Sequence, residues 1–250
     1  DEAMATAQIE GEVLQVNSVR ASAARRLGLL GAKADERDAR TEATLDVLQA
    51  AIAQSQQALN HDMLCGWHAA LFPTGRSGIK KIRAGAYRDH AEPMQIVTPR
   101  LGKPDIVHYQ APDSADVQAQ MTRLIDWFNS SYNQTDGLVR AALAHLWLEA
   151  IHPFEDGNGR VGRALVEMAL AQDLKTDKRL WSLSQQMWLD RAGYYAQLQA
   201  ATGQGNMDVT PWVQWFVGCV HKAADATCDH MKTALRKTSF WAELREQHPQ

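Results

Sequence analysis

The chain has 250 residues, of which 45% are hydrophobic and 22% are charged, and its formal net charge is −3. This composition is that of an ordinary folded protein and excludes disorder for most of the chain. The near-neutral charge argues against an unspecific grip on nucleic acid, which needs a clustered basic excess. The three cysteines lack CxxC spacing, so neither a disulfide framework nor a zinc site is expected.

No apolar run approaches the length of about 18 residues that crosses a bilayer, and the N-terminus lacks the core of a signal peptide. We therefore expect a cytoplasmic protein with no membrane partner. The chain begins at Asp1 and ends in a polar stretch, residues 245–250. It is interpreted as a fragment that leads into a further domain.

Apolar residues at helical spacing predict three helices in the first third of the chain, at residues 17–29, 41–59 and 63–71. Gly28 or Gly31 would end the first of them. The texture changes at residues 94–98 and 106–109, which are short β-type runs on either side of a Pro- and Gly-containing turn at residues 99–105. We predict a hairpin inserted between helices, called the flap below. A purely structural hairpin is the alternative.

Helical patterns then resume, at residues 114–128, 138–151, 161–172, 188–201 and 209–230. Asp113 or Ser114 is suited to cap the first of these helices. The stretch 138–151 is apolar almost all round, as expected of a central buried helix. The pattern indicates helices around one shared core, with the flap as an insertion.

The most informative segment is the loop at residues 151–163, which reads IHPFEDGNGRVGR between two apolar helices. Pro153 prevents simple continuation of the first helix, whereas Gly157 and Gly159 tolerate positive φ. The second helix begins at once, so its unpaired amides and the positive end of its dipole face the same loop. This arrangement predicts a binding cradle for an anion.

Charged and titratable side chains surround the predicted cradle. Arg160 and Arg163 lie three residues apart and supply forked donors that suit phosphate oxygens. Asp156 offers a carboxylate to a hard divalent cation, and His152 offers a base near neutral pH. Taken singly, His152 could be a helix-capping group and Asp156 a helix N-cap. Their joint occurrence within twelve residues favours a site.

This loop resembles the motif of the Fic family, HxFx(D/E)GNGRxxR. The motif is matched without a gap by His152, Phe154, Asp156, Gly157, Asn158, Gly159, Arg160 and Arg163. The resemblance extends from the flap through Tyr194 and Tyr195 to the TPWVQWF segment, most of residues 60–220. It implies an all-α core with a small β-hairpin flap, and transfer of AMP from ATP to a protein hydroxyl with Mg²⁺.

The resemblance also assigns roles. His152 would take the proton from the target hydroxyl, Phe154 would anchor the loop, and Asp156 would hold Mg²⁺. The nucleotide would contact Gly157, Asn158, Gly159, Arg160, Val161, Gly162, Arg163, Tyr195, Val97 and Thr98. The target protein would add as a strand to the flap edge at residues 95–98. The implied organisation is N-terminal helices at 1–59, a catalytic core at 60–220 and a helical extension at 221–250.

A second signature lies near the N-terminus, where residues 6–11 read TAQIEG. It resembles the inhibitory helix of the family, (S/T)xxxE(G/N), whose glutamate pairs with the second motif arginine. Here the resemblance implies that Glu10 contacts Arg163 and obstructs productive placement of the γ-phosphate. An exposed glutamate on an N-terminal helix is the alternative.

Some features leave the function open. Thr202 stands where several family members have Asn, which puts the base contact in doubt, and Tyr194 and Tyr195 could instead be core residues. The same site could remove AMP from a modified protein, or serve a nucleotide-sensing module whose catalysis is vestigial. Transfer of phosphate or phosphocholine is less favoured by the intact motif. Family members often form dimers, so a homodimer is a candidate partner.

Overall fold

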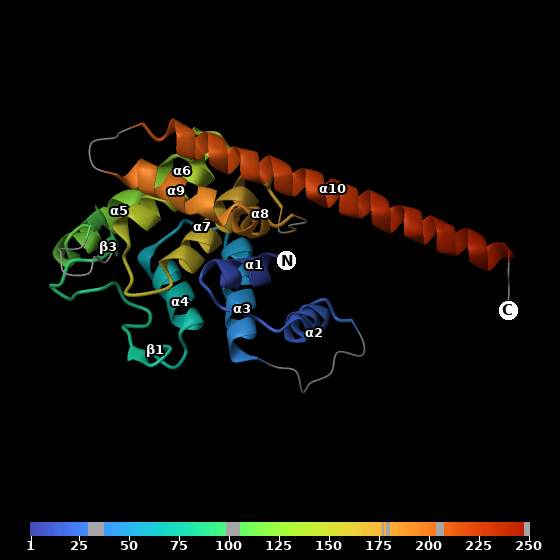
Figure 1. Cartoon of the computed structure of the whole chain (residues 1–250), viewed down its shortest axis with the longest axis horizontal. Coiled ribbons are helices and arrows are strands. Elements are labelled where there is room, and N and C mark those ends of the chain that lie inside the picture. The colour runs from blue at the N-terminus through green and yellow to red at the C-terminus, as the bar shows by residue number, and fades with distance from the viewer. Residues whose placement is uncertain (30–37, 99–105, 177, 179–180, 204–207, 248–250) are drawn as a thin grey trace.

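The computed structural model describes residues 1–29, 38–98, 106–176, 178, 181–203 and 208–247 (Figure 1). Its helices are α1 (Glu2–Ile9), α2 (Val16–Arg26), α3 (Ala39–Ala53), α4 (His61–Leu71), α5 (Ser114–Ser130), α6 (Gly137–Ile151), α7 (Asn158–Leu174), α8 (Leu183–Leu189), α9 (Arg191–Thr202) and α10 (Thr210–Gln247). The strands are β1 (Arg76–Ser77), β2 (Lys80–Lys81), β3 (Gln95–Thr98) and β4 (Ile106–Gln110). The prediction of an all-α fold with a small hairpin is confirmed.

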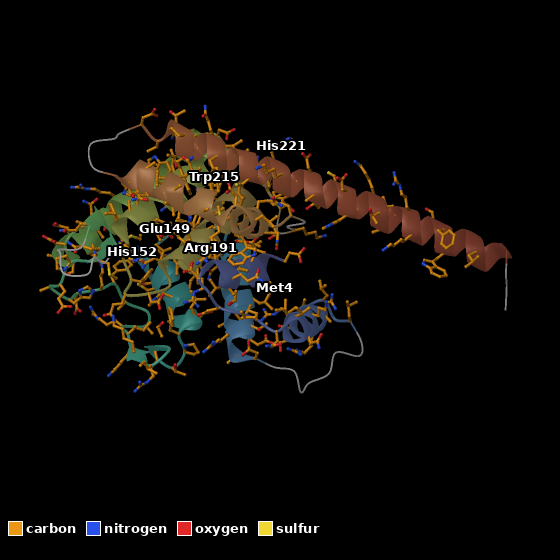
Figure 2. All side chains as sticks on the ribbon, in the orientation of Figure 1. Met4, Glu149, His152, Arg191, Trp215 and His221 are labelled. Atoms are coloured by element: carbon orange, nitrogen blue, oxygen red, sulfur yellow. The ribbon has the colours of Figure 1, made fainter. Side chains whose placement is uncertain are left out.

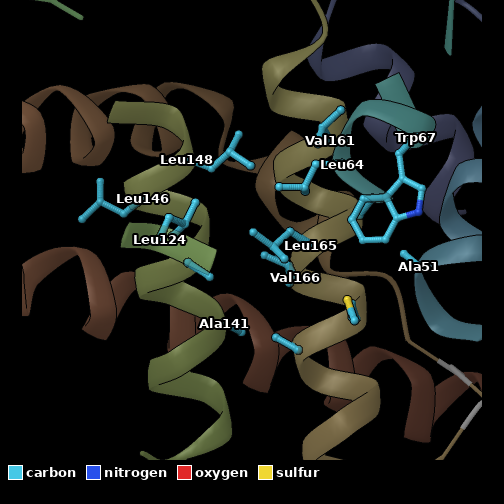
Figure 3. Packing of buried hydrophobic residues seen from close by; sticks show 14 of the residues in the cluster. Ala51, Leu64, Trp67, Leu124, Ala141, Leu146, Leu148, Val161, Leu165 and Val166 are labelled. Atoms are coloured by element: carbon cyan, nitrogen blue, oxygen red, sulfur yellow. The ribbon is translucent and has the colours of Figure 1, made fainter. Parts of the chain in front are cut away.

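Helices α6 and α7 form the centre of the molecule. Every residue of α7 from Asn158 to Gln172 is buried, because other helices surround it. Figure 3 shows its apolar side chains packed between α6 and α4, with Leu165 in the middle of the cluster. Since α7 begins at Asn158, inside the GNG sequence, a helix buried along most of its length carries the predicted anion cradle.

The N-terminal helices pack on one side of this core. Helix α1 lies against α8, α3 and the start of α7, and α2 lies on α3. Glu42 of α3 accepts hydrogen bonds from Ser22, Arg25 and Arg26 of α2, at 2.9, 2.6 and 2.9 Å. Polar contacts thus hold α2, whereas α1 buries small apolar side chains, including Ala5 and Ala7.

The flap strands pair as predicted. Strands β3 and β4 are antiparallel, with Ile96 opposite Tyr109, and a bulge follows because Val97 pairs with Val107. The predicted turn at 99–105 lies outside the described residues. Strands β1 and β2, of two residues each, were not predicted, because so short a pair has no readable alternation.

Several helix boundaries differ from the prediction. The predicted helix 41–59 ends at Ala53. Leu59 lies in the loop that follows, where its side chain is buried and its N–H and C=O both hydrogen-bond to the Asn129 side chain. The predicted helix 188–201 is divided at Asp190, whose carboxylate caps α9 by accepting from Gly193 N. The helix predicted at 209–230 continues to Gln247, and α10 extends away from the body (Figure 1).

The predicted helix 17–29 ends at Arg26, and Gly28 follows with a φ of 68°, as a helix stop requires. The alternative stop, Gly31, lies outside the described residues. Among the helices described, none combines the length and apolarity needed to cross a membrane.

A buried arginine joins the central helices. Arg140 of α6 donates to Phe128 O at 3.2 and 3.0 Å and to Gln172 Oε1 at 2.5 Å. Its guanidinium also stacks on the Phe128 ring at 3.9 Å. Burial lowers the pKa of Arg140 to about 10, so the group remains charged at neutral pH.

We expect Arg140→Ala to lower the free energy of unfolding by about 2 to 4 kcal/mol, because it leaves Gln172 Oε1 without a donor and Phe128 O with only the long bond from Ser131 Oγ at 3.4 Å. Urea denaturation measures the change. Arg123→Ala, on the exposed face of α5, is the matched control and should shift stability by about 0.5 kcal/mol or less. Equal effects of the two substitutions would contradict the assigned role.

Candidate active site

His152 occupies the turn between the two central helices. It follows the last residue of α6 with a φ of 50°, and its N–H donates to Leu148 O at 2.9 Å. Its carbonyl accepts from Arg88 Nε at 2.9 Å, and the same guanidinium reaches Pro112 O. Arg88 is 2% exposed. This arginine therefore fixes the backbone that carries the histidine.

The loop after His152 is closed by its own side chains. Asn158 Nδ2 donates to Phe154 O at 2.8 Å, and Phe154 N donates to Asn158 Oδ1 at 2.9 Å. The Phe154 ring is fully buried and stacks on His68 with 4.1 Å between ring centroids. Both polar ends of Asn158 are thus engaged within the loop. Its side chain therefore closes the loop, and the contact of Asn158 with a nucleotide stays a prediction.

Asp156 is held from three sides. Gly85 N donates to His68 Nδ1 at 2.9 Å, so Nε2 carries the proton that is donated to Asp156 O at 3.0 Å. Burial lowers the pKa of His68 to about 4, consistent with this neutral ring. The Asp156 carboxylate accepts from Gly157 N at 2.5 Å and from Ser77 Oγ. The residue that begins α7 as its N-cap is Gly157, with a φ of 78°.

A cavity of about 410 Å³ opens over this loop. It is lined by Glu10, Tyr109, Glu149, His152, Glu155, Asp156, Gly157, Asn158, Gly159, Tyr194, Tyr195, Leu198, Gln199 and Thr202. The structure therefore brings together seven of the predicted site residues, from α1 to α9. Figure 2 shows Glu149 and His152 near the end of α6.

The remaining predicted residues lie elsewhere. Arg160 lines a separate cavity of about 270 Å³ together with Glu12, whose carboxylate it meets at 3.3 Å. Val161 packs into the core and donates its amide to Gly157 O, and Gly162 faces α6, so neither opens to the larger cavity. The side chains of Val97 and Thr98 lie outside the described part of the structure.

Arg163 is the most buried charge of the site. It is 2% exposed, and its Nη2 donates to Glu10 Oε1 at 2.8 Å and to Thr6 O at 3.1 Å. Its Nε donates to Thr6 Oγ1. Burial acts to lower the pKa of Arg163, but the Glu10 carboxylate outweighs it and holds that pKa above its ordinary value. The last turn of α1 is therefore bound to α7 by a charge pair.

One guanidinium nitrogen is left over. Within the described residues, Arg163 Nη1 is buried without a hydrogen-bond partner. A Cβ atom at position 159 would lie 3.0 Å from this nitrogen and would overlap Glu10 Oε1. Only glycine leaves room there, so Gly159 opens a path from the cavity to an unsatisfied cation.

The end of α1 also contacts the predicted base-binding residue. Ile9 O accepts from Tyr195 Oη at 3.2 Å and from Arg191 Nη2 at 3.0 Å. Tyr194 lies behind Tyr195 and is buried, with its hydroxyl 2.9 Å from His145 Nε2. Tyr194 is therefore a core residue, while Tyr195 faces both the cavity and α1.

The histidine is suited to accept a proton. Burial lowers the pKa of His152 below its ordinary value, although hydrogen bonding to the Glu149 carbonyl opposes the shift. The imidazole is therefore neutral at physiological pH. A neutral imidazole at the wall of a cavity, beside the amides that begin a helix, is the arrangement that general-base chemistry on an anionic substrate requires.

Glu149, Arg88 and Tyr109 were not predicted as site residues from the sequence. Glu149 could have been noticed, because it interrupts an apolar helix three residues before His152. Arg88 and Tyr109 lie in segments without helical periodicity and offered no such signal.

A model of the Fic/DOC family matches residues 58–170, and a model of a domain of unknown function (DUF4172) matches residues 1–29. Residues 58–170 therefore form a Fic domain. The Fic match contains the whole of α6 and the loop with His152, and the second match contains α1 with Glu10. The charge pair between Glu10 and Arg163 thus joins the two matched regions.

Curated relatives carry the name "Protein adenylyltransferase Fic". The chain is 32% identical to that of Drosophila willistoni over 137 residues, which are 54% of this chain and 26% of the relative. It is 28% identical to that of Nematostella vectensis over 138 residues, 55% of this chain and 30% of the relative. The matches span less than a third of the length of these relatives.

Solved structures share the fold. A Fic family protein from Desulfovibrio desulfuricans G20 aligns with a TM-score of 0.65 and 23% identity, over 93% of this chain and 64% of its own. A Fic domain containing signaling protein from Bacteroides thetaiotaomicron aligns with a TM-score of 0.66 and 18% identity, over 90% and 84%. These alignments establish the architecture of the chain.

We expect Gly159→Ala to displace Glu10 from Arg163, because the added Cβ occupies the position of Oε1. The predicted cost is about 1 to 3 kcal/mol in the free energy of unfolding, with faster hydrogen exchange at residues 10–12. Gly66→Ala is the matched control: position 66 is an open helical site, so alanine should stabilise by about 0.5 to 1 kcal/mol. Unchanged exchange in Gly159→Ala would contradict the predicted overlap.

Proposed function

We propose that the chain transfers AMP from ATP to a hydroxyl side chain of a target protein and that α1 restrains this activity. The observation that carries the proposal is the unpartnered Nη1 of buried Arg163, placed beside Gly159 in the wall of a cavity that also holds neutral His152. A buried cation with a free donor is costly unless an anion completes it. The names of the curated relatives support this reaction.

In the proposed reaction the target hydroxyl attacks the α-phosphorus of ATP. A bond forms from that oxygen to phosphorus, the bond to the β-phosphate oxygen breaks, and pyrophosphate leaves. His152 takes the hydroxyl proton. The amides of Asn158, Gly159 and Arg160 precede the first helical bond of α7, from Val161 N to Gly157 O, so they are available to phosphate oxygens.

The residues present fit a magnesium ion. In the described residues no group of three His, Cys, Asp or Glu side chains gathers to hold a metal, but Mg²⁺ commonly takes one or two carboxylates and completes its shell with phosphates and water. Asp156 lines the cavity with its carboxylate already oriented by Ser77 and Gly157. Asp156 would hold the ion, which would neutralise charge on the phosphates.

The opposite end of the cavity would receive the nucleotide base. Tyr195, Leu198 and Thr202 line this end. An aromatic ring and an aliphatic side chain suit a planar base, and we propose adenine because the curated relatives are named adenylyltransferases. Thr202 offers a hydroxyl where the family often has an amide, and this hydroxyl now donates to Leu198 O at 2.8 Å.

We call the contacts of Thr6 and Glu10 with Arg163 the brake. Glu10 occupies the guanidinium that a γ-phosphate would need, and its carboxylate adds negative charge to the cavity. The same last turn of α1 engages Tyr195 through Ile9 O. The brake would thus act on the phosphate-binding side through Glu10 and on the base-binding side through the neighbouring Ile9 carbonyl.

Removal of AMP from a modified protein is a second candidate, because Glu10 and His152 line one cavity and a carboxylate can orient water. Glu10→Gly separates the candidates, since it should raise transfer but abolish removal. A nucleotide-sensing module without chemistry would bind ATP and show neither activity.

We expect His152→Ala to lower transfer by about 10² to 10⁴, the usual worth of a general base. We expect Glu10→Gly to raise it by roughly 5 to 150-fold, since the brake competes with the γ-phosphate for Arg163. Intact mass and radiolabelling after incubation with ATP and Mg²⁺ measure the transfer to the chain itself or to a target.

The double variant Glu10→Gly, His152→Ala is the control for background labelling and should be inactive. Labelling of this double variant at the level of Glu10→Gly would refute the role of His152. Glu10→Gly that binds ATP by calorimetry but forms no adduct would favour the nucleotide-sensing reading.

A further prediction concerns the target. If a target strand adds to the edge of β3, Val97→Pro should reduce modification of the target more than it reduces ATP binding, because proline removes a main-chain donor and restricts the strand. Val97→Thr keeps the N–H and the β-branch and is the matched control. Equal loss of target modification and ATP binding in Val97→Pro would count against docking there.

A further inference from the structure

Glu149 is half-buried, but one of its carboxyl oxygens is fully buried and has no partner among the described residues. It lies on α6 and lines the same cavity as Glu10 and His152, and Oε1 accepts no hydrogen bond from the described residues. This oxygen points toward Gly162 of α7, lying 3.3 Å from the position a Cβ would take there. A carboxyl group in such a place is unstable as an anion unless it faces a positive charge, and otherwise it keeps its proton.

The groups around Glu149 come from four elements. His145 and His152 belong to α6 and its end, Tyr194 belongs to α9, Arg163 to α7, and Glu10 to the last turn of α1. Burial lowers the pKa of His145 to about 3, lowers that of His152, and raises that of Tyr194 well above its ordinary value. At neutral pH these three groups are therefore uncharged.

One cation and two carboxyl groups remain. The Arg163 guanidinium is paired with Glu10 at 2.8 Å, so a second ionised carboxylate would find no free positive charge. Burial and the Glu10 charge raise the pKa of Glu149 to about 7, although Arg163 opposes the shift. With Glu10 docked, Glu149 therefore keeps its proton in mildly acidic solution and loses it as pH rises through about 7.

We propose that Glu149 is the reserve counter-ion of Arg163: it is protonated while Glu10 is docked and ionises when the last turn of α1 carries Glu10 away, so that opening of the brake releases a proton. The inference concerns the regulation of the proposed active site and rests on the brake, but not on the transfer reaction. It explains why an unpaired carboxyl group lies within the field of a guanidinium that already has a partner.

The sign of the pH dependence follows from the two states. Departure of Glu10 removes a negative charge, so the pKa of Glu149 is lower in the open state than its value of about 7 in the docked state. Docking is therefore strongest below the pKa of the open state and weakens as pH rises through about 7. Above that pH the opening constant should level off.

Hydrogen exchange at residues 10–12, the turn that follows α1, tests the proposal without nucleotide. The amides of Glu10, Gly11 and Glu12 donate to Ala7 O, Gln8 O and Ala7 O at 3.0, 3.0 and 2.9 Å, so their exchange reports the opening that moves Glu10. After correction for intrinsic rates, we expect the opening constant to rise by about tenfold between pH 5.5 and 7. In Glu149→Gln, which cannot ionise, this rise should disappear.

Glu155→Gln is the matched control, because Glu155 lines the same cavity but lies in the loop after α6 rather than on α6 itself. It should keep the pH-dependent opening. The same pH dependence in Glu149→Gln as in the wild type would overturn the proposal, and so would an opening constant in the wild type that does not change with pH.

A direct titration covers the case in which Glu149→Gln is poorly folded. Carboxyl carbon NMR of the wild type should show Glu149 titrating near the pKa of about 7, and Glu10→Gln should move that titration to lower pH. An unchanged titration in Glu10→Gln would also overturn the proposal. Because neither measurement involves ATP, their outcome is independent of whether the chain transfers AMP.

Discussion

The buried guanidinium of Arg163 is the constraint on which the site depends. It projects from α7, the helix that the rest of the fold surrounds, and it is held by three contacts from Thr6 and Glu10. A charge at this depth is tolerated only with a counter-ion. The family-matched core therefore needs an anion at this point, and the structure supplies one from α1. In the proposed function ATP competes for the same place.

The loop before α7 is fixed by side chains that leave the first amides of α7 unoccupied. Arg88 fixes the carbonyl of His152, His68 fixes the carbonyl of Asp156, and Asn158 closes the loop on Phe154. Each of these side chains satisfies backbone groups that the sharp turn leaves unpaired. None of these side chains accepts from the amides at the start of α7. Those amides therefore remain available to a ligand, although the loop around them is fixed by hydrogen bonds.

Much of this arrangement could be predicted from the sequence, and the rest fails for identifiable reasons. The long apolar stretch of α6 and the β-type runs on either side of a Pro- and Gly-containing turn were enough to locate α6 and the flap strands. Helical periodicity failed at Leu59, whose apolar side chain fits the pattern although the residue lies in a loop held by Asn129. An apolar residue at helical spacing shows that a position is buried, but not that it is helical. The pairing of Glu10 with Arg163 came from resemblance alone. Composition and spacing carry no information about contacts across so long a stretch of chain.

The way α1 is attached determines how the brake can open. Its first turn is fixed by Glu2, which accepts hydrogen bonds from Ser182 Oγ at 2.8 Å and Ser184 N at 3.0 Å, and Ala5 and Ala7 along the helix are fully buried. Undocking the whole helix would expose this apolar surface and leave polar groups on α8 unpaired. Moving only the turn at residues 10–12 breaks three backbone hydrogen bonds and two ion pairs, that of Glu10 with Arg163 and that of Glu12 with Arg160. The smaller movement leaves the core intact, so a single carboxylate can leave Arg163 without unfolding the elements that position His152.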